Sequence, residues 1–314
     1  MSGMMRKGVS EGGTVAVCFH RGYIDVARIG RNGDARPVLE LCTSLPRGDN
    51  DADTLARLGR ELRLSRVPCV TLMSHGDYQL QVIDAPDVPE SELKAAVRWR
   101  LTDVLDYPPD AATVDVIAVP AEPSALMRGR SVYAVAARSE LIAERMMVFS
   151  AAKLSLRAID IPEMAQRNVA ALFEVPNRAL AMLSLTAERG LLTFTAGAEL
   201  YLARSIDVGL SQLQRAQGDL RSQLLERVLL EVQRSLDHFD RQFSYLSVSK
   251  LVLAPLRDDA GLQTQLREGL YIEVEEASLE HCLDLSRVPE VTSQRMQAEQ
   301  LLTIGAALRG EVSQ

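Results

Sequence analysis

The chain has 314 residues, of which 47% are hydrophobic and 25% are charged, and its formal net charge is −7. This length and composition fit about two globular domains and exclude a wholly disordered chain. The acidic balance argues against nucleic acid as a partner. The four cysteines and four histidines show no metal-site spacing, and no apolar run reaches the roughly 18 residues of a membrane span. We therefore expect a cytoplasmic protein without a metal ion and without direct membrane insertion.

The first part of the chain predicts a strand meander followed by a helix and a further strand. Apolar runs predict strands at 14–19, 23–29, 37–43 and 67–73. Asp53 is expected to cap a helix that reaches about Leu64, and Asn32–Gly33 predicts a hairpin turn.

A strand–helix–strand–strand block follows, which we interpret as an inserted subdomain. Its strands are predicted at 78–83, 113–119 and 131–137, and its helix runs from Pro89 to about Leu105. The chain then continues with a helix from Ser139, a strand at 156–161 and a helix from Pro162 to about Phe173.

From Arg178 the opening pattern returns. Strands are predicted at 180–185, 191–195, 200–206, 250–253 and 271–274, and helices at 211–243, 262–270 and 294–309. Three strands, a helix, a strand, a helix, a strand and a helix therefore occur twice, interrupted once by the inserted block. This duplication predicts an α/β, actin-like fold with two lobes. The expected parts are a first lobe of 14–77 plus 139–174, an insert of 78–138 and a second lobe of 175–310.

The positions that would bind a nucleotide in an actin-like ATPase carry unsuitable residues. Each lobe should offer a hairpin with an Asp for hydrated magnesium and a Gly near the phosphates. These positions hold Cys18 and His20 in the first lobe, and Ser184 and Thr186 in the second. The expected Gly-Gly loop under the adenosine contains Pro255 instead. We expect no catalytic residues and no cofactor; a rewired ATP–Mg site in an actin-like ATPase or kinase is the alternative.

Four stretches resemble the PilM family of type IV pilus assembly proteins. Residues 89–109 have an acidic helix start, then Arg-Trp, and an Asp-Tyr-Pro ending, and the stretches 158–168, 231–243 and 304–309 follow in the family's order. The similarity spans about residues 14–310. It is greatest to the PilM-like proteins of mannose-sensitive haemagglutinin (MSHA) pilus systems, whose nucleotide motifs are similarly degenerate.

The resemblance implies a non-catalytic cytoplasmic adaptor, peripheral to the inner membrane. Such proteins bind the cytoplasmic N-terminal peptide of a single-pass, PilN-like membrane protein, in a groove between the first lobe and the insert; pilus assembly ATPases are further candidate partners. We expect the insert helix to contact the peptide through Val97, Arg100, Leu101 and Val104, unless this stripe only faces the core. Trp99 either covers the insert's sheet or marks a contact surface. The cytoplasmic part of a GspL-like type II secretion scaffold is another hypothesis, although such chains normally carry a transmembrane segment.

Overall fold

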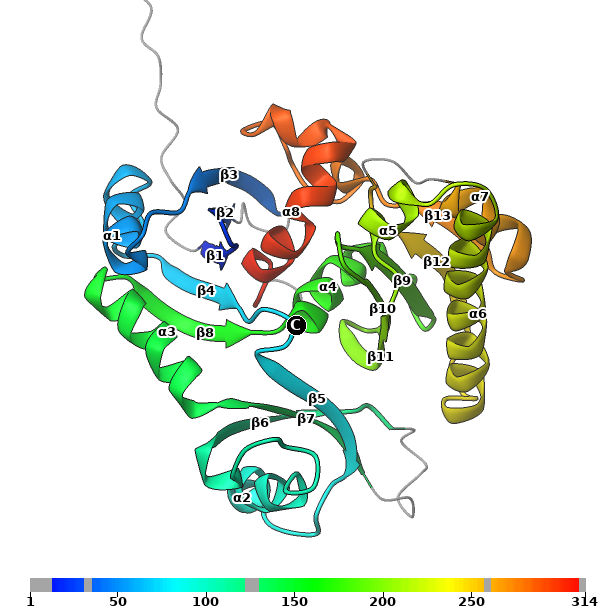
Figure 1. The fold of residues 1–314 in the computed structure, drawn as a ribbon, viewed down its shortest axis with the longest axis horizontal. Helices are drawn as coiled ribbons and strands as arrows, with labels where there is room; N and C mark the ends of the chain where they lie inside the picture. The colour runs from blue at the N-terminus through cyan, green and yellow to red at the C-terminus, as the bar shows by residue number, and fades with distance from the viewer. Residues whose placement is uncertain (1–12, 31–35, 122–129, 257–260, 311–314) are drawn as a thin grey trace, which may run out of the picture.

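The computed structural model describes residues 13–30, 36–121, 130–256 and 261–310. These residues form two five-stranded sheets and one three-stranded sheet (Figure 1). The predicted turn at Asn32–Gly33 lies outside the described residues.

The two larger sheets share one topology. Their strand orders are β3-β2-β1-β4-β8 and β11-β10-β9-β12-β13. When the strands of each sheet are numbered along the chain, both sheets have the order third, second, first, fourth and fifth. In both, the first strand pairs antiparallel with the second and parallel with the fourth. The predicted two-lobe α/β fold is therefore confirmed.

The first sheet contains β1 (Thr14–Phe19), β2 (Tyr23–Gly30), β3 (Val38–Pro46), β4 (Pro68–Leu72) and β8 (Ser155–Asp160). The second contains β9 (Ala179–Leu185), β10 (Gly190–Ala196), β11 (Glu199–Ile206), β12 (Val248–Leu253) and β13 (Glu273–Glu276). The helices of these two lobes are α1 (Asp51–Glu61), α3 (Ser139–Ala151), α4 (Pro162–Ala170), α5 (Leu210–Arg215), α6 (Gly218–Gln242), α7 (Leu262–Gly269) and α8 (Gln294–Ala307).

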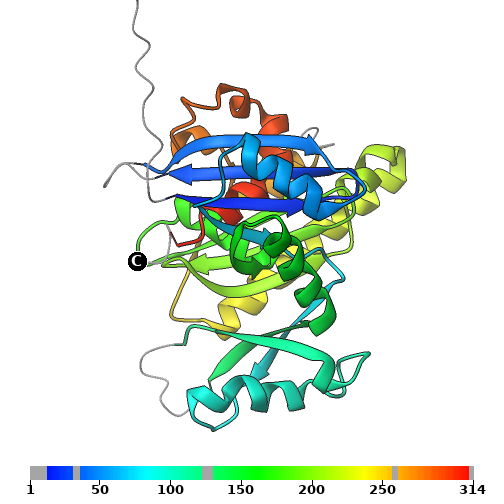
Figure 2. The same cartoon turned by 90° about the vertical axis from the view of Figure 1, so that its left-hand side faces the viewer.

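The insert is a small layer of its own. Its sheet has the order β5-β7-β6, with β5 (Tyr78–Asp84), β6 (Ala112–Ala118) and β7 (Ser131–Arg138), and α2 (Glu90–Arg100) covers one face. Figure 2 shows this layer at the opposite end of the molecule from β3.

Two helices are exchanged between the lobes. α4 follows β8 of the first sheet but packs on β9, β10 and β11, while α8 comes after the second sheet but packs on β1, β2 and β4. The two helices also pack on each other between the sheets (Figure 1). Their crossing is close, because a Cβ at Gly305 would lie 2.2 Å from the backbone oxygen of Ala165.

The structure differs from the sequence predictions at several helix boundaries. The insert helix α2 ends at Arg100, whereas it was predicted to reach about Leu105. The helix predicted at 211–243 is two helices, because Ala216 and Gln217 are extended, with ψ of 145° and 156°. The cap of α1 is Asn50, whose side chain accepts from the backbone N–H of Asp53 at 3.1 Å. Asp53 therefore lies inside the helix that it was predicted to cap.

Candidate functional site

A groove lies between the first lobe and the insert, with a volume of about 270 Å³. Its residues come from α3, β8 and the insert strands β6 and β7, together with Met73 and Ile161. Most of the lining is aliphatic, so an occupant would bury apolar side chains there.

One side of the groove is the backbone edge of β8. Four consecutive residues, 156 to 159, line it. Since successive side chains of a strand point to opposite faces, only an edge presents four in a row. β8 is also the last strand in the order of its sheet. An edge strand presents main-chain N–H and C=O groups to which another strand can pair.

The other walls are the insert sheet and α3. Thr113 and Asp115 of β6 and Val135 and Ala137 of β7 line the groove. The Asp115 carboxylate is paired with Lys94 at 2.6 Å, so its charge is already balanced.

From α3, Ile142 and Met146 complete the lining. Met146 is 57% exposed and its neighbour Met147 is 62% exposed, so apolar surface continues beyond the groove. Methionine side chains adapt readily to a partner's shape.

The structure corrects the predicted partner contacts on the insert helix. Val97 and Leu101 are fully buried, in a core shared with Val114 and Ala134. Their helix face covers the insert's own sheet, so these two side chains are not available to a partner. The prediction that they contact one is wrong, and the alternative of a core-facing stripe holds for them.

The remaining residues of that prediction are at the surface but outside the groove lining. Arg100 is exposed, and its Nη1 donates to the backbone oxygen of Asp84 at 2.9 Å. Val104 is 42% exposed and Trp99 61%. Trp99 therefore does not cover the insert's sheet. The residues that do line the groove were missed by the sequence argument; the one local signal was the exposed apolar pair Met146–Met147 on a helix whose buried residue is Phe149.

Cys18 and His20, at the first-lobe position expected for a nucleotide, both contact other parts of the protein. Cys18 is buried, and burial raises the pKa of its thiol to about 12, against a hydrogen bond from Thr303 that lowers it. The ring of His20 stacks on Tyr23 with centroids 4.4 Å apart, and its Nε2 lies 3.0 Å from the Asp25 carboxylate. A thiol with so high a pKa is a poor nucleophile.

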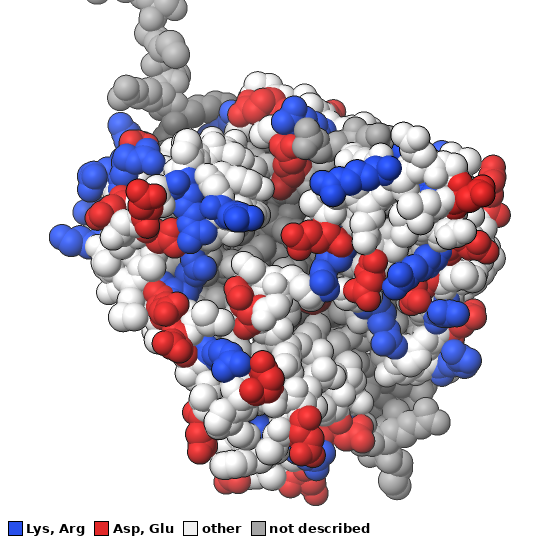
Figure 3. Space-filling model, in the orientation of Figure 1, with Lys and Arg blue, Asp and Glu red and all other residues white. Residues whose placement is uncertain are grey.

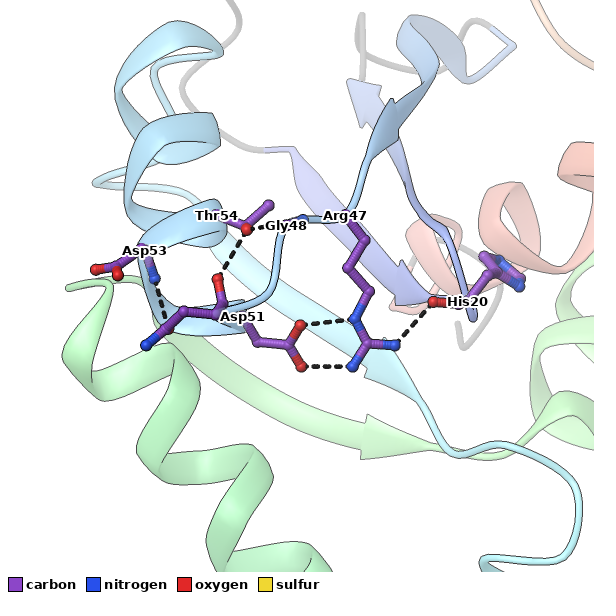
Figure 4. A network of polar contacts seen from close by, with 7 residues as sticks. His20, Arg47, Gly48, Asp51, Asp53 and Thr54 are labelled. Carbon is purple, nitrogen blue, oxygen red and sulfur yellow. Dashed lines mark hydrogen bonds and ion pairs between the residues drawn. The ribbon is translucent and has the colours of Figure 1, made fainter.

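The backbone around His20 is held by a polar network (Figure 4). Arg47 binds the Asp51 carboxylate through two hydrogen bonds of 2.6 and 2.7 Å and donates a third, of 2.8 Å, to the backbone oxygen of His20. The His20 ring itself points away from Arg47 (Figure 4). The network thus fixes the turn between β1 and β2 against the start of α1.

Ser184, at the corresponding second-lobe position, is also bonded within the protein. The Ser184 hydroxyl donates to Gln166 Oε1 at 2.5 Å, and Gln166 Nε2 donates to the backbone oxygen of Met182 at 2.9 Å. Gln166 is fully buried and belongs to α4, the helix that comes from the first half of the chain.

The other two residues of the predicted second-lobe site are Thr186, which follows β9, and Pro255, which comes after β12. The Thr186 hydroxyl donates to the backbone oxygen of Arg189, and Pro255 is buried directly after β12. Among the described residues, no group of three His, Cys, Asp or Glu side chains could hold a metal ion. In the same part of the chain, no helix is long and apolar enough to cross a membrane.

Comparison with known proteins places the fold in one class. No family model matches the chain, and a search of curated protein sequences finds no match. Solved structures do match, and they have the actin-like fold: one is a Bacteroides thetaiotaomicron protein with an actin-like ATPase fold and unknown function, with a TM-score of 0.51 at 10% identity over 93% of this chain and all of that chain.

Two solved structures come from secretion and pilus systems. A chain of a PilM–PilN type IV pilus biogenesis complex matches with a TM-score of 0.73 at 21% identity, covering 97% of this chain and 99% of that one. The cytoplasmic domain of EpsL, an inner-membrane component of the Vibrio cholerae type II secretion system, matches with a TM-score of 0.53 at 13% identity, covering 94% of each chain. At these identities the likeness establishes the shared fold.

Proposed function

We propose that this chain is a non-catalytic adaptor of type IV pilus assembly that holds an extended peptide of a membrane-anchored partner in the groove beside β8. The observation that carries this proposal is the strand edge at residues 156–159, exposed along an apolar groove. An extended peptide gains main-chain hydrogen bonds at such an edge while its side chains fill the flanking pockets.

The partner we propose is the cytoplasmic N-terminal segment of a PilN-like, single-pass inner-membrane protein. The likeness in fold to a chain of a PilM–PilN complex, over nearly the full length of both chains, supports this choice. The chain would then act at the cytoplasmic face of the inner membrane, held there through its partner. Within pilus systems we propose the MSHA type, with this chain in the role of MshI and the assembly ATPases as further partners.

Absence of catalysis is part of the proposal. Cys18, His20, Ser184 and Thr186 are each bonded to or packed against other parts of the protein, which supports this part of the proposal. The Ser184–Gln166 hydrogen bond places a side chain of α4 against the position where a magnesium-binding carboxylate would be needed. Charged side chains of both signs are interspersed over the face in Figure 3, which does not favour a nucleic-acid partner.

A scaffold of the GspL type is the second candidate function. The EpsL cytoplasmic domain has the same fold as this chain, which supports it. The two candidates differ in the partner that they bind, so a peptide-binding measurement separates them.

The test is the affinity of a labelled peptide, read by fluorescence anisotropy. The peptide should hold about ten N-terminal residues of a PilN-like protein from the same organism, enough to pair with the six residues of β8. We expect a Kd in the micromolar range, about −8 kcal/mol. No binding of this peptide, together with binding of a GspL partner, would favour the second candidate.

Two adjacent methionines provide a matched pair of variants. Met146 lines the groove and Met147 does not, yet both are more than half exposed. Met146→Glu should weaken peptide binding by about tenfold or more, whereas Met147→Glu should change it much less. Both should stay folded, because exposed substitutions usually change stability by less than about 0.5 kcal/mol. Equal effects of the two substitutions would argue against this groove.

A further inference from the structure

The insert sheet turns its second face toward two different parts of the molecule. Ala134 and Ala136 of β7 face the core under α2. Tyr133, Val135 and Ala137 alternate with them and point to the opposite face. Val135 and Ala137 line the groove against the first lobe, while Tyr133 packs into the core of the second lobe.

Tyr133 is attached to the second lobe by its hydroxyl. That hydroxyl donates to the backbone oxygen of Tyr201 at 3.2 Å and accepts from the backbone N–H of Ala203 at 3.0 Å. Both groups belong to β11, the edge strand of its sheet. The hydroxyl therefore satisfies two main-chain groups of the kind that a neighbouring strand would bond.

The surroundings of Tyr133 make this attachment specific. Its side chain is 1% exposed, and Leu80, Ile117 and Val119 of the insert region join it in the second-lobe core. Burial raises the pKa of Tyr133 to about 12, so the hydroxyl keeps its proton and can donate at neutral pH. Apolar contacts alone do not fix the position of the insert along β11, whereas the two hydrogen bonds are directional and do fix it.

We propose that Tyr133 is a positioning residue for the groove: its two hydrogen bonds to β11 hold the insert sheet and so set the wall formed by Val135 and Ala137. This inference rests on the proposed function of the groove. A peptide that packs against Val135 immobilises β7 two residues from Tyr133. Docking against the first lobe therefore steadies the hydroxyl contact at the second lobe, and the groove and β11 are coupled through one strand.

The test is amide hydrogen exchange, followed by mass spectrometry, with and without the N-terminal PilN-like peptide. In the wild-type chain we expect the peptide to slow exchange in 155–160, where it binds. We also expect slower exchange in 199–206, although no residue of β11 lines the groove.

Tyr133→Phe keeps the ring and removes both hydrogen bonds. In this variant we expect exchange in 199–206 to be faster without peptide and unchanged by it, and peptide affinity to fall several-fold. Tyr107→Phe is the control, because Tyr107 also lies in the insert, where it packs on the insert's own core with its ring 4.2 Å from the Arg138 guanidinium. It should behave as wild type.

The outcomes separate this inference from the function on which it rests. Protection in 155–160 without any change in 199–206, or the same remote change in Tyr133→Phe as in wild type, overturns the role of Tyr133 and leaves the adaptor proposal standing. Absence of protection in 155–160 overturns the adaptor proposal, and the positioning role falls with it.

Discussion

Glu163, in the first turn of α4, is a partly buried carboxyl that gives the fold a defined pH dependence. Burial raises its pKa above the ordinary value of 4.5; a hydrogen bond of 2.6 Å from the Tyr78 hydroxyl lowers it in part, and nearby Asp160 raises it further. A raised pKa means that the neutral form is favoured in the folded chain. The stability from this group is fully present below its ordinary pKa and is lost as the pH rises through the raised value.

We therefore expect Glu163→Gln to be more stable than the wild type at about pH 8, with an advantage that shrinks toward about pH 4. The glutamine oxygen can still accept from Tyr78, but the cost of burying a charge is gone. Thermal melts across this range measure the difference, with Glu144→Gln on the exposed side of α3 as the control. An advantage that does not depend on pH would contradict this account.

The cysteines provide a second prediction at the scale of residues. Cys18, Cys42 and Cys69 are buried, and burial raises the pKa of each thiol to about 12. Cys282 is partly exposed, and its partial burial also raises the pKa of its thiol. In the native protein a thiol reagent at neutral pH should modify Cys282 alone and leave the other three unmodified, whereas all four should react in denaturant. Rapid modification of Cys18 in the native protein would contradict this prediction.

At the scale of elements, the close crossing of α4 and α8 holds the two lobes together. Asn168 Nδ2 donates to the backbone oxygen of Gly305 at 2.8 Å, across this crossing. Gly305→Ala would push a methyl group into the Ala165 carbonyl, so the helices must separate. We expect a loss of about 1–3 kcal/mol in the free energy of unfolding, measured by urea denaturation. Gly22→Ala, with nothing within 4 Å of the added Cβ, should unfold like the wild type.

Hydrophobic periodicity predicted the elements well but not what each apolar face touches. The stripe of Val97 and Leu101 was correctly placed on one side of a helix, yet periodicity does not say whether that side meets its own sheet or a partner. Likewise the run from 211 to 243 contains no proline, and periodicity alone did not show the break at Ala216 and Gln217, which Gly218 with its φ of 53° follows.

At the scale of the whole molecule, the groove could not be predicted residue by residue. Its lining combines Met73, Thr113, Val135, Ile142 and Leu156, which lie far apart in the sequence and meet only when the insert folds back on the first lobe. The repeated order of strands and helices was enough to predict two lobes and an insert, whereas the groove's general position was implied by the resemblance to the PilM family. Which side chains face it depends on tertiary packing.

The residues at the expected nucleotide positions lead to a prediction for the whole chain. We expect millimolar ATP–Mg to leave the melting temperature unchanged, because Ser184 is bonded to Gln166 and Cys18 is buried. A ligand present at about 100 times its Kd would stabilise the fold by roughly 2.7 kcal/mol, a shift that a thermal melt detects easily. A clear, magnesium-dependent rise in melting temperature would instead favour the ATPase or kinase alternative.

The central claim is that a partner peptide lies along β8, between the first lobe and the insert. Photo-crosslinking tests it directly, with the PilN-like N-terminal peptide carrying a benzophenone side chain and the products mapped by mass spectrometry. We predict crosslinks to α3, β8, β6 and β7, where Met146, Ile159 and Val135 line the groove. Crosslinks confined to the outer face of α2 around the exposed Trp99, or to the second lobe, would contradict it.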